Sequence, residues 1–83
     1  MMLDLKTFFE EKQIPFTYWE IEHNGVMHYI DSDFVIQAVL ATKGEERNKI
    51  AGTLFALDFN NASIVDYLHF LAKAMIAHNS YIV

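Results

Sequence analysis

The chain has 83 residues, no cysteine and a formal net charge of −5, from eleven acidic and six basic residues. This length accounts for one domain, so residues 1–83 are expected to fold as a single unit, without a disulfide framework, a thiolate nucleophile or a cysteine-ligated zinc site. The few Lys and Arg residues are not clustered, which argues against a nucleic-acid-binding domain.

Hydrophobic residues make up 53% of the chain, and 14% of the residues are aromatic. A folded chain of this size buries only about 60 to 65% of the surface that its unfolded form exposes. We therefore expect part of this apolar area to remain on the surface, where it contacts a second molecule. Closed two-fold dimers are the commonest outcome, so a homodimer is expected.

The first residues lack the basic region, apolar core and cleavage site of a secretory signal, which favours a cytoplasmic protein. The most apolar stretch, residues 62–77, is interrupted by Asp66, His69 and Lys73. It therefore falls short of the roughly 20 apolar residues that a membrane span requires.

Residues 4–13 carry Leu5, Phe8 and Phe9 at helical spacing, after an Asp4 that can cap the first turn. We expect a short helix here, ended by Pro15.

Two segments rich in aromatic and β-branched residues, 16–23 and 26–30, flank the pair Asn24-Gly25. This pair supplies the positive backbone angles of a type I′ turn, so the segments should form an antiparallel hairpin. The turn fixes the register, and one side then faces the core with the pairs His23–Val26, Ile21–His28 and Trp19–Ile30. The other side shows Glu20, Glu22, Met27 and Tyr29 to water or to a partner.

The run Asp31-Ser32-Asp33 resembles a helix start, because short polar side chains cap the free N–H groups of a first turn. The same run could be a pair of magnesium ligands, but no Gly-rich or basic segment nearby would hold a phosphate. The helix should bury a stripe formed by Val35, Ile36, Val39 and Leu40 and end near Gly44.

Residues 45–59 fit two patterns. Ile50, Leu54 and Leu57 keep helical spacing, whereas Thr53, Phe55 and Leu57 alternate as in a strand. We favour the helix. The expected fold is α+β with the order αββααα, and the alternative is αββαβα with a three-stranded antiparallel sheet.

The last helix should open with Ser63 and Asp66 as a capping arrangement and run to about His78. One apolar stripe along it consists of Ile64, Leu68, Leu71 and Met75, and a second of Tyr67, Phe70, Ala74 and Ala77. A helix that is apolar on two sides should be buried on both. We therefore assign the second stripe, together with Tyr81 beyond it, as the candidate dimer interface.

Catalytic and cofactor motifs are lacking in the sequence. His23 and His28 share one side of the hairpin, but no third ligand is spaced to complete a zinc site with them. Serine-nucleophile elbows and phosphate-binding glycine loops do not occur either. We expect neither a metal nor a cofactor, and no enzymatic activity.

Three hypotheses follow for function. The first is a protein that binds other proteins, as a homodimer. The second is a small-ligand or enzymatic pocket between the hairpin and the helices, lined by Trp19, His28, Tyr29 and Phe34. The third is an inhibitor that mimics nucleic acid, since residues 1–34 hold seven acids against two lysines. Its acidic face would consist of Glu20, Glu22, Asp31 and Asp33.

Overall fold

A computed structural model describes residues 4–58 and 60–78. Its elements, in chain order, are α1 (Leu5–Lys12), β1 (Tyr18–His23), β2 (Val26–Asp31), α2 (Ser32–Leu40), α3 (Gly44–Ala56) and α4 (Asn61–Ala77). The predicted α+β order αββααα is confirmed. The three-stranded alternative is not supported, because the segment proposed as its third strand lies inside α3 and the hairpin sheet has two strands.

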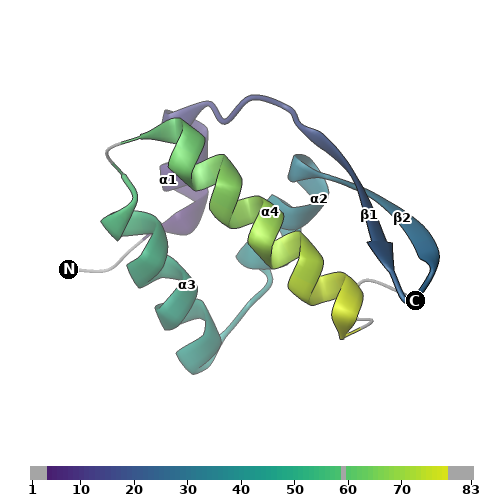
Figure 1. The fold of residues 1–83 in the computed structure, drawn as a ribbon. Helices are drawn as coiled ribbons and strands as arrows, with labels where there is room; N and C mark the ends of the chain where they lie inside the picture. Colours follow the sequence, from purple (N-terminus) through teal and green to yellow (C-terminus); the bar gives the residue numbers. More distant parts are fainter. Residues whose placement is uncertain (1–3, 59, 79–83) are drawn as a thin grey trace.

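Helix α4 crosses the middle of the molecule (Figure 1). It packs on α2 and on β1, while α2 also contacts β2, α1 and α3. The hairpin lies toward one end of α4. Helices α1 and α3 lie toward its other end. This arrangement leaves the long side of α4 that faces the viewer in Figure 1 uncovered by another helix.

Helix α1 begins at the predicted cap. The Asp4 carboxylate accepts hydrogen bonds from the Lys6 and Thr7 N–H groups, at 3.1 and 3.3 Å, and from the Thr7 hydroxyl at 2.9 Å. The hydroxyl bond is the main reason that the pKa of Asp4 is lowered. Gln13, with a left-handed φ of 51°, donates its N–H to Phe9 and closes the helix before Pro15 is reached.

The hairpin forms with the register that the sequence predicts. Asn24 and Gly25 have φ values of 52° and 78°, as a type I′ turn requires, and Trp19 faces Ile30 while Ile21 faces His28. Ile21 and Ile30 are buried in the core.

The junction between β2 and α2 differs from the prediction in one residue. Asp31 caps the helix, because its Oδ1 accepts the Phe34 N–H at 2.8 Å. Ser32, expected to cap, is instead buried and extends the hairpin. Its Oγ accepts the Thr17 N–H at 2.9 Å, and its own N–H donates to the Thr17 carbonyl at 2.8 Å.

Helix α2 ends at Leu40, before Gly44 is reached, and Gly44 starts α3 with a φ of 64°. Arg47 of α3 donates from its guanidinium to the Leu40 carbonyl at 3.2 Å, which ties the two helices together. The helical alternative for this segment is confirmed because α3 runs from Gly44 to Ala56, with Ile50, Ala51 and Leu54 buried.

Helix α4 starts earlier than predicted. Asn60 caps it by accepting the Ala62 N–H on Oδ1 at 2.8 Å, so the proposed capping role of Ser63 is wrong. The Asn61 side chain donates to the Lys12 carbonyl at 3.1 Å, which joins this end of α4 to the end of α1. An ion pair between Lys12 and Asp58 reinforces the same junction.

Candidate interaction surfaces

The inward side of α4 is a stripe of Ile64, Leu68, Ala72 and Ile76, each at most 1% exposed. The sequence predicts the first two of these but joins them to Leu71 and Met75, which are only partly buried. Ala72 and Ile76 continue the four-residue spacing of Ile64 and Leu68. This spacing alone would have predicted that they lie on the buried stripe.

The second apolar stripe of α4, which we call the outer stripe, consists of Tyr67, Phe70, Ala74 and Ala77. Phe70 is two residues from both Leu68 and Ala72 and therefore lies about 200° around the helix from them. Its side chain is 63% exposed. The rings of Tyr67 and Phe70 stack with centroids 6.1 Å apart. Tyr81, the fifth predicted interface residue, lies outside the described residues.

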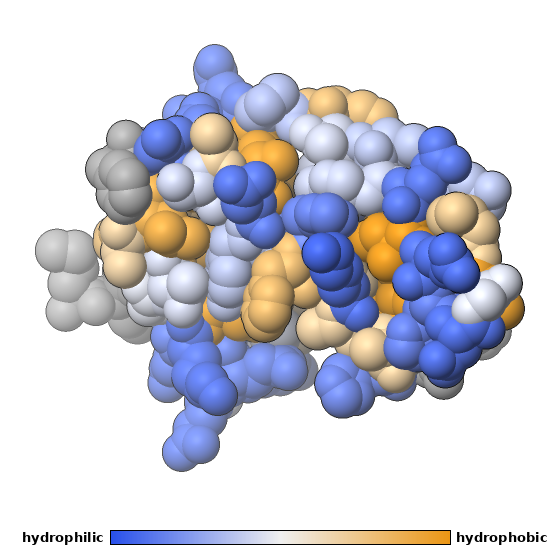
Figure 2. All heavy atoms as spheres, viewed as in Figure 1, coloured by the Kyte–Doolittle hydropathy of each residue, from blue (hydrophilic) through white to orange (hydrophobic). Residues whose placement is uncertain are grey.

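Apolar side chains reach the surface between hydrophilic ones on the face that α4 crosses (Figure 2). Ala77 is exposed and Ala74 partly exposed, so the outer stripe has two large aromatic side chains followed by two small residues. Such a surface offers both apolar area and a place for close approach of another helix.

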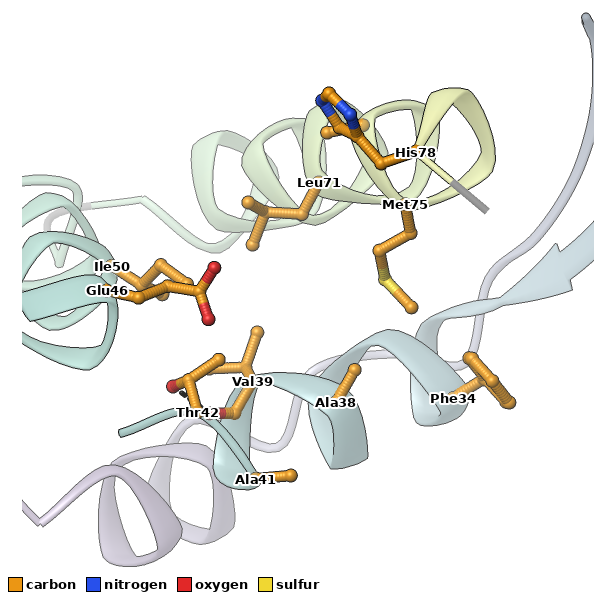
Figure 3. Close-up of a pocket in the computed structure, with 11 residues that line it drawn as sticks. Phe34, Ala38, Val39, Ala41, Thr42, Glu46, Ile50, Leu71, Met75 and His78 are labelled. Atoms are coloured by element: carbon orange, nitrogen blue, oxygen red, sulfur yellow. Dashed lines mark hydrogen bonds between the residues drawn. The ribbon is translucent and has the colours of Figure 1, made fainter. Parts of the chain in front are cut away.

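A groove of about 530 Å³ lies beside the outer stripe, between α2, α3 and α4. Leu71 and Met75 point into it from α4 toward Val39 on α2, and Glu46 extends its carboxylate into it from α3 (Figure 3). Its remaining lining residues are Phe34, Ala38, Ala41, Thr42, Ile50, Ala74 and His78. The groove shares Ala74 with the outer stripe, so the two apolar surfaces are continuous.

The four residues predicted to line a pocket do not share one cavity. The Trp19 indole stacks on His69 of α4, with centroids 5.2 Å apart. His28 lies on the same side of the hairpin, opposite Ile21. Tyr29 lies on the other side of the hairpin, and Phe34 lines the helical groove.

A second cavity, of about 540 Å³, does lie between β1 and α4. None of the four predicted residues lines it. Its lining consists of Glu20, Ile21, Glu22 and His23 from β1 and His69, Lys73, Ile76 and Ala77 from α4. Burial is the main reason that the pKa of His69 is lowered, and the Lys73 ammonium adds to this effect while Asp66 opposes it.

The outer hairpin face, formed by Tyr18, Glu20, Glu22, Met27 and Tyr29, is open to solvent. Tyr18 and Tyr29 are 55% and 58% exposed, and their rings stack with centroids 6.2 Å apart and an interplanar angle of 16°. Tyr29 was predicted on this face, but its stacking with Tyr18 was not. The register reveals it, because Tyr18 and Tyr29 are diagonal neighbours on this face.

The four predicted acidic residues occupy different positions. Glu20 and Glu22 are exposed on the outer hairpin face. Asp31 is partly buried and caps α2, and Asp33 is exposed in the first turn of that helix. Desolvation raises the pKa of Tyr18, and the carboxylates of Glu20 and Asp31 add to the increase.

Within residues 4–58 and 60–78, no three His, Asp or Glu side chains converge as a possible metal-binding group. None of the helices in this described part is long and apolar enough to cross a lipid bilayer. No protein-family model, curated protein or solved structure has detectable similarity to the chain. The candidate surfaces therefore carry the functional argument.

Proposed function

We propose that this chain is a small cytoplasmic interaction protein that forms a homodimer through the outer stripe of α4, and that it acts by binding rather than by catalysis. The single observation that carries this proposal is the position of Phe70, a large aromatic side chain that is 63% exposed on the side of α4 opposite the core. Burying it against a second copy would remove apolar surface from water.

The charges on α4 favour an antiparallel pairing of two copies. Asp66 and Lys73 are seven residues apart, almost two full helical turns, and lie beside the outer stripe on either side of Phe70 along the helix. A two-fold axis near Phe70 reverses the direction of the second α4. It would bring Asp66 of each copy opposite Lys73 of the other, so the two charges would be complementary across the interface.

The outer stripe also runs along a long helix. Helix α4 has 17 residues and is therefore about 25 Å long. Ala74 and Ala77 would permit close approach of the helices, while Tyr67 and Phe70 supply the large contact area that dominates most interfaces.

The first test compares two phenylalanines with the same exposure. Phe70 and Phe16 are each 63% exposed, but Phe16 lies in the segment before β1. In sedimentation velocity at micromolar concentration, the wild type should be a dimer, Phe70→Glu a monomer and Phe16→Glu a dimer. A monomeric wild type, or equal disruption by both substitutions, would contradict the proposal.

A charge exchange tests the antiparallel geometry. Asp66→Lys alone should weaken the dimer about tenfold, because like charges would then face each other. Adding Lys73→Asp restores opposite charges and should recover most of the loss. If the double variant is as weak as the single variant, the two helices do not pair in this orientation.

Binding of a small apolar molecule in the helical groove is a second candidate function. The volume of about 530 Å³ falls in the usual range of ligand sites. The neutral dye Nile red should fluoresce on binding the groove, and Ala38→Phe, which fills it, should abolish the signal. Ala62→Phe, on the exposed start of α4, is the matched control. Unchanged fluorescence with Ala38→Phe would exclude the groove as the dye site.

A further inference from the structure

The negative charge of the chain is concentrated around the hairpin. Residues 13–42 contain four of the eleven acidic residues and none of the six Lys and Arg residues. The rest of the chain carries seven acids and six bases and is almost balanced. Within this segment no Lys or Arg neutralises the carboxylates, and the nearby base is Lys73 of α4, which lines the same cavity as Glu20 and Glu22.

The outer hairpin face combines this charge with exposed apolar surface. Glu20 lies directly opposite Tyr29, and Glu22 lies directly opposite Met27. Cross-strand partners have Cβ atoms about 5 Å apart, so each carboxylate stands beside an apolar or aromatic side chain. Met27 is 45% exposed, and the stacked Tyr18 and Tyr29 rings are more exposed still.

We propose that the outer hairpin face binds an extended, arginine-containing segment of another protein. A guanidinium is planar, stacks on aromatic rings and pairs with carboxylates, so it matches both components of this face. Glu20 and Glu22 are about 7 Å apart along β1, which equals the spacing of alternate side chains in an extended peptide. The stacked tyrosines receive one guanidinium while the two glutamates pair with the next.

This site and the outer stripe lie on different elements, although Glu20 and Glu22 share the cavity between β1 and α4 with Lys73 and Ala77. The peptide site lies on the hairpin side that faces away from the core, whereas the proposed dimer uses α4. A monomeric protein would therefore still bind the basic segment, and a dimer would offer two such faces. Failure of either proposal leaves the other testable.

The test uses a fluorescein-labelled peptide of four Arg-Ser repeats, measured by fluorescence anisotropy at low salt. Glu20→Gln with Glu22→Gln should weaken binding about tenfold. Glu10→Gln with Glu11→Gln removes the same charge from two exposed positions in α1 and should change binding less than about twofold. Circular dichroism confirms that both double variants remain folded.

A second comparison isolates the aromatic contribution. Tyr18→Ala with Tyr29→Ala should also weaken the arginine peptide several-fold, and replacing every arginine of the probe by lysine should do the same. Equal weakening by the Glu10 and Glu11 control would mean that net charge alone attracts the probe, and would overturn the proposal. Indifference to the tyrosines, or no binding by the wild type at low salt, would overturn it as well.

Discussion

Helix α4 and the β1–β2 hairpin are both two-sided elements, with one side in the core and the other open to solvent. On α4 the open side carries Phe70 with one acid and one base beside it. On the hairpin the open side carries stacked tyrosines between acids, and no base. A charge-balanced surface can be complementary to a second copy of itself, whereas an acidic surface favours a basic partner over a second copy, and the two proposals rest on this difference.

The largest effect is expected from substitutions that compare the buried side of α4 with its exposed side. Leu68 is fully buried, so Leu68→Ala leaves a cavity and should lower the free energy of unfolding by about 3 kcal/mol. Phe70→Ala should change the stability of the monomer by less than about 0.5 kcal/mol, because the ring is mostly in water. Urea denaturation at protein concentrations below the dimer dissociation constant measures both values. Similar losses for the two variants would mean that Phe70 belongs to the core.

A smaller effect is expected at the stack of Trp19 on His69, the contact that joins the hairpin to α4. The pKa of His69 is lowered from 6.5 in the folded chain, mainly by burial. The unfolded chain therefore binds the proton more tightly than the folded chain does. The contribution of His69 to stability is complete above pH 6.5, and it decreases as the pH falls toward the pKa of His69 in the folded chain.

The variant His69→Phe keeps an aromatic ring against Trp19 but cannot titrate. Its free energy of unfolding should decrease less than that of the wild type between about pH 8 and pH 5. Thermal or urea denaturation across this range gives the comparison, and the other three histidines are common to both proteins. Identical pH profiles would show that the histidine ring is as well solvated as in the unfolded chain.

Local patterns made much of this structure predictable. The hairpin register follows from Asn24-Gly25, because only residues that tolerate positive φ fit a type I′ turn and the turn then aligns every pair. The helices, and the placement of Phe70 on another side of α4 than Ile64 and Leu68, follow from the 3.6-residue helical period. The cap of α4 was predicted wrongly, since Asn60 and Ser63 both have side chains that can accept an N–H, and Asn60 is the one that does so at the start of α4.

The groove was decided by the tertiary structure alone. The groove brings Val39, Glu46 and Met75 together from three helices, and no periodicity within one segment specifies how three helices pack. Trp19 and Tyr29 are both aromatic hairpin residues, but alternation along the strands directs them to opposite sides, and the packing of α4 determines which side is covered. The sequence by itself therefore determined which residues share a face, because that depends on local backbone geometry. Only the packing of distant segments decided which faces remain open.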